Sequence, residues 1–201
     1  MKLRFYYPLP IKMEFEGKRY GLRLTAANVL RYLELCDDPE GLTFEEVTEI
    51  GFGGLVKGGQ KLPPYKKAEL LDRIFKEYIN PPKKRLKGQK NQSVVSFGYD
   101  SGFIYSAFME AYGIDLWEQA QKMHWCKFLA LFEGLPENCI LRQIMGIRAQ
   151  PIPVPNGHNQ EEIQRITELK ALYALPSKTT AEETQNGWEA LFNFLERRAK
   201  E

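Results

Sequence analysis

The chain has few of the residues that build metal, redox or nucleophilic sites. Its 201 residues include two histidines, His124 and His158, and three cysteines, Cys36, Cys126 and Cys139. An odd number of cysteines without a CxxC pair argues against a disulfide framework and a zinc site, and fits a reducing compartment. We therefore expect no metal and no cofactor.

His124 is two residues from Cys126 in a segment with helical spacing. Two side chains so placed on a helix point about 200° apart, at about 100° per residue. They are poor joint metal ligands and a poor nucleophile and base pair. We interpret His124 as a packed histidine bonded to a backbone group, and His158, in a proline-rich loop, as solvated.

Long apolar segments are missing as well. No run of about 18 apolar residues could cross a bilayer, and residues 1–20 lack the apolar stretch of a secretory signal. The composition of 43% hydrophobic and 27% charged residues is near the average of soluble globular proteins. We expect a soluble protein with no membrane partner that stays where it is made.

Glycine is concentrated in residues 51–64, without a phosphate-binding pattern. Gly53 and Gly58 have P-loop spacing, but Gly59 stands where that loop needs a lysine. So many glycines and prolines predict an irregular loop. The acidic pairs of the chain lie at predicted helix ends, where the helix dipole explains them. We therefore predict that the protein is not an enzyme; carboxylates that meet only in space stay an open alternative.

The net charge of +2 is unevenly distributed. Residues 57–90 carry eleven Lys and Arg against three acids, a local charge of +8, which leaves −6 for the rest. Within residues 57–90, one basic segment could contact nucleic-acid phosphates. This segment lacks the interleaved aromatic residues on which the bases of a single strand would stack. We interpret it as a solvated linker, with nucleic acid or an acidic protein as open alternatives. The segment consists of Lys83, Lys84, Arg85 and Lys87.

Hydrophobic periodicity predicts a mainly α fold, a multi-helix bundle with a small N-terminal β-hairpin. The hairpin is expected to turn near Gly17, after an alternating start with Leu3, Phe5 and Tyr7. Helices are predicted over residues 26–36, 44–50, 65–78, 101–112, 116–133, 138–147, 160–175 and 181–200, with a short strand at 93–97. The expected caps are Thr25, Thr43 with Glu46, Asp100 or Ser101, and Asp115 with Glu118. Phe75, Tyr78, Leu172 and Tyr173 are expected among the inward-facing residues.

The same pattern divides the chain into three parts. Residues 1–80 hold the hairpin and the first helices, residues 81–95 are a basic linker, and residues 96–201 form a helical region; one continuous domain is the alternative. The third part is built on the aromatic helix pair of residues 100–136. This pair has more aromatic surface than one core stripe needs, and Tyr and Trp are favoured as binding anchors. Our candidate partner-binding residues are Tyr105, Phe108, Trp117 and Trp125, with Tyr105 and Trp117 expected to be exposed.

Several strings in this part carry a family resemblance. They are Ser101-Gly102-x-Ile104-Tyr105-x-x-Phe108, Tyr112-Gly113-Ile114-Asp115-Leu116, His124-Trp125-x-Lys127-Phe128, Gly134-Leu135-Pro136 and Ile144-Met145-Gly146-x-Arg148. In order and spacing they resemble the family of siphophage tail-gene proteins catalogued as gene product fifteen. Residues 15–20 resemble its opening hairpin and residues 172–176 its closing segment. Cys126 replaces an expected Trp, and residues 51–92 match poorly.

The resemblance implies a non-catalytic tail assembly chaperone, encoded close to the tape-measure gene. It implies the tape-measure protein as partner, and the tail tube protein as a second, with self-association as a further hypothesis. It also implies action in the host bacterial cytoplasm and absence from the mature virion. The family brings no catalytic residues. The alternatives are a basic helical nucleic-acid-binding or regulatory phage protein and a structural tail component.

Overall fold

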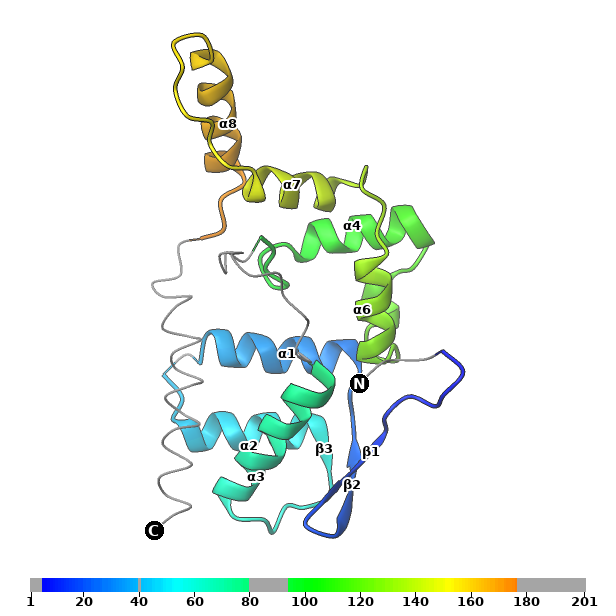
Figure 1. Ribbon diagram of the computed structural model, residues 1–201. Coiled ribbons are helices and arrows are strands. Elements are labelled where there is room, and N and C mark those ends of the chain that lie inside the picture. The colour runs from blue at the N-terminus through cyan, green and yellow to red at the C-terminus, as the bar shows by residue number, and fades with distance from the viewer. Residues whose placement is uncertain (1–4, 40, 80–93, 177–201) are drawn as a thin grey trace. The chain divides into compact units, whose positions relative to one another are not determined.

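The computed structural model describes residues 5–39, 41–79 and 94–176. These residues form a mainly α fold with one small antiparallel sheet (Figure 1), as the sequence predicts. The predicted C-terminal helix and nearly all of the predicted linker lie outside the described residues. The division at residues 81–95 therefore stays a prediction.

The described residues group into two compact units, each made of two stretches of chain. Unit 1 contains residues 5–39, 41–79 and 116–133, and unit 2 contains residues 94–115 and 134–176. The aromatic segment 100–136 is thus divided, because its first helix belongs to unit 2 and the rest of its helical residues to unit 1.

The sheet of unit 1 consists of β1 (Lys12–Phe15), β2 (Lys18–Leu22) and β3 (Val56–Lys57), in that order and antiparallel. The turn between β1 and β2 is Glu16-Gly17, with φ angles of 48° and 72°. Two consecutive positive φ angles are typical of a type I′ turn, whose twist matches that of the strands. The predicted hairpin at Gly17 is confirmed.

The chain before the hairpin differs from the prediction. Phe5 and Tyr6 lie in a turn, and Phe5 is 100% exposed, so Phe5 and Tyr7 do not mark a strand; Leu3 lies outside the described residues. The alternation fails here because these side chains have no second strand to pack against. Conversely, β3 was not predicted, since two residues are too few to show a period.

Helices α1 (Ala26–Asp37) and α2 (Phe44–Leu55) begin at the predicted caps. The Thr25 hydroxyl accepts a hydrogen bond from the backbone N–H of Asn28 at 3.2 Å. Thr43 and Glu46 form a complete capping box. Each cap satisfies backbone donors that the first helical turn leaves unpaired.

Helix α2 continues past Gly51, where we predicted a loop. A Cβ at position 51 would lie 2.5 Å from Cε2 of Tyr32, a residue of α1. Glycine at this position therefore permits close packing of α1 on α2 rather than ending the helix.

Helix α3 (Pro64–Ile74) passes directly into a π-helical turn, η1 (Phe75–Ile79). Phe75 and Tyr78, which we expected to be buried, are half-buried, whereas Ile79 is buried. The wider π turn rotates the side chains away from the period of 3.6 that the prediction assumed.

The single helix predicted after Asp115 is wrong. The segment forms α5 (Leu116–Gln119) and α6 (Trp125–Glu133), separated by turns. At the break, the Ala26 N–H donates to the Met123 carbonyl and the Trp125 N–H donates to the Leu24 carbonyl, both at 2.7 Å. A continuous helix would pair these groups of the 116–133 segment internally, so tertiary hydrogen bonding overrides the helical pattern here.

Unit 2 contains α4 (Ser101–Tyr112), α7 (Ile140–Ala149) and α8 (Gln160–Leu172), close to the predicted ranges. Helix α4 ends at Gly113 in the left-handed conformation (φ 63°), as predicted. The predicted strand at 93–97 is wrong, because residues 94–96 are irregular and residues 97–100 form a turn. Leu172 is 71% exposed rather than inward-facing, since it lies in the last turn of α8.

Lys170 of α8 is bonded to the C-terminal end of α7. Its Nζ donates to the carbonyl oxygens of Ile147 (3.3 Å), Arg148 (2.6 Å) and Gln150 (2.8 Å). Carbonyls at the end of a helix have no intrahelical donors and carry the negative end of the dipole. The ammonium therefore caps α7 and fastens α8 to it.

Candidate functional site

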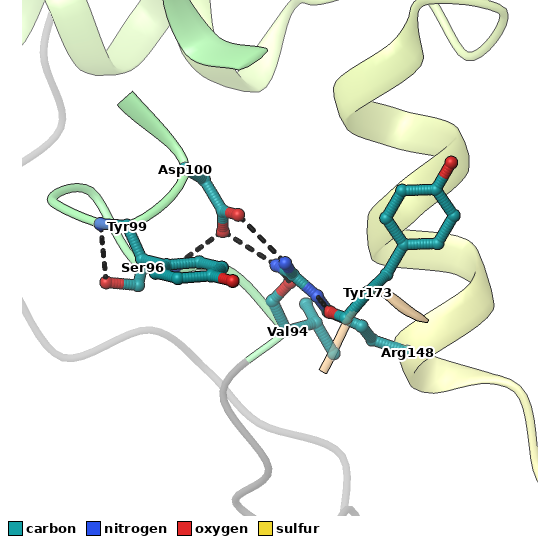
Figure 2. A network of polar contacts seen from close by, with 6 residues as sticks. All are labelled: Val94, Ser96, Tyr99, Asp100, Arg148 and Tyr173. Carbon is teal, nitrogen blue, oxygen red and sulfur yellow. Dashed lines mark hydrogen bonds and ion pairs between the residues drawn. The ribbon is translucent and has the colours of Figure 1, made fainter. Parts of the chain in front are cut away.

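A buried ion pair joins the start of α4 to α7 within unit 2. Asp100 is fully buried and Arg148 is 8% exposed. The guanidinium holds the carboxylate with two hydrogen bonds, Nη1 to Oδ2 at 2.6 Å and Nη2 to Oδ1 at 2.8 Å (Figure 2). Parallel, two-point geometry of this kind is the strongest form of the pair.

Both members of the pair make further hydrogen bonds. Arg148 donates from Nε to the Tyr173 carbonyl at 2.6 Å and from Nη1 to the Val94 carbonyl at 3.0 Å. Asp100 Oδ2 accepts the Ser96 N–H at 2.9 Å. These five residues, the Arg148 network, connect three stretches of unit 2: the turn before α4, the end of α7 and the end of α8 (Figure 2).

The network corrects our assignment of a cap to α4. Asp100 occupies the N-cap position but its side chain makes no capping hydrogen bond, and Ser101 is the first helical residue. The carboxylate instead compensates the buried charge of Arg148, which would be very costly unpaired. Four of the five N–H groups of Arg148 are bonded within unit 2, so the network is suited to holding the three stretches together.

Sequence reasoning did not find this network. Asp100 and Arg148 are 48 residues apart, and neither helical periodicity nor motif spacing relates residues at that distance. One signal was present, because Arg148 closes the otherwise apolar string Ile144-Met145-Gly146-x-Arg148 within α7. A charged residue within an inward-facing pattern calls for a buried partner.

His124 is bonded to backbone groups through both ring nitrogens, as predicted. Its Nδ1 accepts the Cys126 N–H at 3.2 Å, so Nε2 carries the proton and donates to the Pro10 carbonyl at 3.1 Å. The residue directly precedes α6, and its hydrogen bond with the Cys126 N–H caps the first turn of that helix. Burial lowers the pKa of His124, opposed by the bond to Pro10 and aided by nearby Lys127.

Two of the four candidate partner-binding residues lie in the interior. Phe108 is 0% and Trp125 1% exposed. Trp125 donates from Nε1 to the Ile79 carbonyl of η1 at 3.1 Å and stacks on Phe128 with 5.3 Å between ring centroids. Both residues are core residues, so we remove them from the candidate surface.

The other two candidates differ in exposure. Trp117 is 80% exposed, as expected, whereas Tyr105 is half-buried. Helix α5, which carries Trp117, has no buried residue. The structure therefore leaves Trp117 as the clearest exposed aromatic residue of the segment, with Tyr105 beside the core of unit 2.

Other sequence-based candidates can be placed only in part. Lys83, Lys84, Arg85 and Lys87 lie outside the described residues. Within the described ranges, no three His, Cys, Asp or Glu residues are grouped so that they could hold a metal ion. No helix in these ranges has the length and apolar character needed to cross a membrane.

Comparison with known proteins gives one match. No curated protein and no solved structure matches the chain. The model of a family described as Bacteriophage Gp15 protein matches residues 6–175, which include the hairpin, the aromatic segment, the Arg148 network and α8. On this match over most of its length, the chain belongs to the bacteriophage Gp15 protein family.

Proposed function

We propose that the protein is a non-catalytic tail assembly chaperone that binds the phage tape-measure protein and helps the tail tube assemble around it. Membership of a bacteriophage family supports the phage origin, and the sequence resemblance to siphophage tail-gene proteins supports the assembly role. On this proposal the tape-measure protein and the tail tube protein are its partners. It acts in the host bacterial cytoplasm and is absent from the mature virion.

The observation that carries this proposal is the exposure of Trp117. Leaving an indole 80% exposed forgoes the stabilisation that its burial would give. Tryptophan is also among the residues that most often dominate binding energy at protein interfaces. Since α5 contributes no buried residue, Trp117 is better explained by a partner than by the core of unit 1.

Exposed aromatic residues near the N-terminus also favour contact with a partner. Phe5, Tyr6 and Tyr7 are 100%, 64% and 60% exposed, and consecutive ring centroids lie 5.3 and 5.1 Å apart. A long helical client offers repeated apolar stripes, which separate aromatic anchors can contact weakly and release. Such contacts suit a protein that must leave when the tube forms.

The thiols and His124 favour a role without catalysis. Burial raises the pKa of Cys36 to about 12 and also raises the pKa of Cys126. Both thiols are therefore protonated at neutral pH and are poor nucleophiles. Both nitrogens of His124 are engaged by backbone groups, so the imidazole is not free to act as a base.

The test is co-expression with a fragment of the tape-measure protein, followed by affinity purification. We expect the two proteins to co-purify, and Trp117→Ala to lower recovery of the fragment by about tenfold, the effect of a moderate hot-spot residue. Tyr65→Ala, at a residue 51% exposed on α3, is the matched control and should leave recovery unchanged. Absence of co-purification with the unmodified chain would refute the proposal.

Two further measurements separate the alternatives. Salt-sensitive DNA binding that is lost on neutralising Lys83, Lys84, Arg85 and Lys87, without client binding, would establish a nucleic-acid-binding protein instead. Mass spectrometry of purified particles tests whether the protein is a structural tail component. A chaperone should be missing from finished tails, whereas a structural tail component should be present in fixed proportion.

A further inference from the structure

The outward side of the unit 1 sheet is basic. Lys12 of β1 and Lys57 of β3 both stand opposite Gly21 of β2, so these positions form one row across the sheet. Glu14 and Arg19 form the next row. All four charged residues are exposed, while the alternating residues of β1 and β2 are buried in the core.

Arg23 follows the last residue of β2 and lies two positions after Gly21, so it is on the same outward side of the sheet. Its guanidinium donates to the carbonyls of Gly53 and Val56, which holds it at the β3 edge. We call Lys12, Arg19, Arg23 and Lys57 the basic face. With Glu14 its charge is 4 − 1 = +3, and within the described residues no carboxylate forms an ion pair with any of the four cations.

The other end of unit 1 is acidic. Between residues 32 and 56 the sequence has no Lys, Arg or His, but it has seven carboxylates: Glu34, Asp37, Asp38, Glu40, Glu45, Glu46 and Glu49. Five of these are exposed at the end of α1 and the start of α2. This acidic end consists of Glu34, Asp37, Asp38, Glu45 and Glu46.

Part of the acidic end is unfavourable for its own helix. Glu34 and Asp37 lie in the last turns of α1 and Asp38 is its C-cap, and the last turn contains no basic residue. The C-terminal end of a helix carries partial negative charge, so carboxylates there lower helix stability. A cationic surface of a second molecule would interact favourably with these exposed carboxylates.

The two charged surfaces lie at opposite ends of unit 1. Helix α1 begins just after β2 and α2 runs directly into β3, so the α1–α2 connection lies far from the sheet (Figure 1). Each helix has 12 residues, about 18 Å at about 1.5 Å per residue. This separation exceeds the Debye length of about 8 Å at physiological salt, so the surfaces do not neutralise each other within one molecule.

We propose that unit 1 associates head to tail, with the basic face of one copy on the acidic end of the next. Such a contact leaves a free basic face and a free acidic end on every oligomer, so further copies can add. Exposed ion pairs are individually weak and screened by salt, which makes the association reversible and concentration-dependent. The basic face has no aromatic residue for base stacking and contains Glu14, which favours protein carboxylates over nucleic acid.

This inference rests on the proposed function only in the role that it gives to the association, which is that a row of copies would cover a long helical client. The contact itself needs no client, so it is tested without one. Self-association without client capture would uphold it and defeat the chaperone proposal. Client capture by a strictly monomeric chain would uphold the chaperone proposal and defeat the head-to-tail association.

The experiment measures the mass of the full chain by light scattering and sedimentation over a range of concentrations. At about 0.02 M salt we expect the mean mass to rise with concentration, and at about 0.5 M salt to fall to that of the monomer. A chain that is monomeric at every concentration in low salt would overturn the proposal. So would association that appears only when DNA is added.

Charge reversal provides the specific test. Lys12→Glu with Lys57→Glu makes the basic face net negative, at −1, and Glu34→Lys with Glu45→Lys reduces the charge of the acidic end from −5 to −1. Each double variant should therefore weaken association by at least about tenfold. Mixing the two variants should restore association, which loss of folding could not do. Lys122→Glu with Lys127→Glu, at exposed positions of unit 1 that belong to neither surface, should have no effect. Failure of the mixture to associate, or an equal loss in this control, would overturn the proposal.

Discussion

The ring of Tyr32 occupies the space that a side chain at position 51 would need. An added Cβ at Gly51 would meet Cε2 of Tyr32 at 2.5 Å and Cδ2 at 2.7 Å, and Tyr32 itself is 5% exposed. The absence of one methyl group in α2 therefore sets how closely α1 and α2 pack. It also gives a packing reason for glycine at position 51, inside a helix.

Gly51→Ala should destabilise the protein by about 1–3 kcal/mol, because a well-packed ring must move to admit the methyl group. The chain offers a matched control two residues later. A Cβ at Gly53, also within α2, has no atom within 4 Å, so Gly53→Ala should stabilise by about 0.5–1 kcal/mol through helix propensity and a less flexible unfolded chain. Urea unfolding measures the change in the free energy of unfolding for each variant. Changes of the same sign in the two variants would contradict this account.

The Arg148 network makes a second prediction. Replacing Arg148 by Met leaves the fully buried Asp100 carboxylate without its cation and should cost about 3–5 kcal/mol. The double variant Asp100→Asn with Arg148→Met should lose less, because no buried charge is left uncompensated. Chemical denaturation of the single and double variants measures the coupling. Additive losses would show that the two side chains do not act as a pair.

The elements with strong local signals were predictable from the sequence. The Glu16-Gly17 turn, the caps at Thr25 and Thr43, and the stop at Gly113 depend on residues close in the chain, and all are confirmed. The break between α5 and α6 was not predictable, since it is caused by hydrogen bonds to residues about a hundred positions earlier.

For the candidate partner-binding surface, too, local sequence signals were not sufficient. An aromatic stripe in the sequence does not show which of its side chains are buried in the core. Trp125 is buried because η1 presents the Ile79 carbonyl to its indole N–H, and a π-helical turn leaves no pattern that sequence reading detects. Trp117 stays exposed because the break in the helix detaches α5 from the stripe of α6. Exposure of individual aromatics therefore required the structure.

The Lys170 cap predicts a local effect at the end of α7. Lys170→Met removes a charged donor from three carbonyls while keeping the apolar stem, and should destabilise by about 1 kcal/mol, since water can replace part of the loss. Amide hydrogen exchange in the last turn of α7 should become faster. Lys127→Met, at an exposed lysine of α6, is the control. Unchanged exchange in the Lys170 variant would show that the cap contributes nothing in solution.

His124 gives the protein a pH-dependent contribution to stability, and its sign follows from the direction of the pKa shift. Burial holds the pKa of His124 in the folded chain below its ordinary value of 6.5, so the folded state binds fewer protons than the unfolded state. The contribution is fully present above about pH 6.5 and is lost as the pH falls through the folded pKa. In structural terms, protonation of Nδ1 removes the acceptor of the Cys126 N–H and the cap of α6.

The free energy of unfolding should therefore fall more between about pH 7.5 and about pH 5.5 in the unmodified chain than in His124→Asn. Asparagine is a good N-cap and does not titrate, so the variant keeps a capping group while removing the proton-binding site. His158→Gln, at an exposed histidine, should retain the full pH dependence. Urea titrations of the three proteins at both pH values give the comparison. Parallel losses in all three would mean that His124 does not titrate with folding, and that other groups set the acid sensitivity.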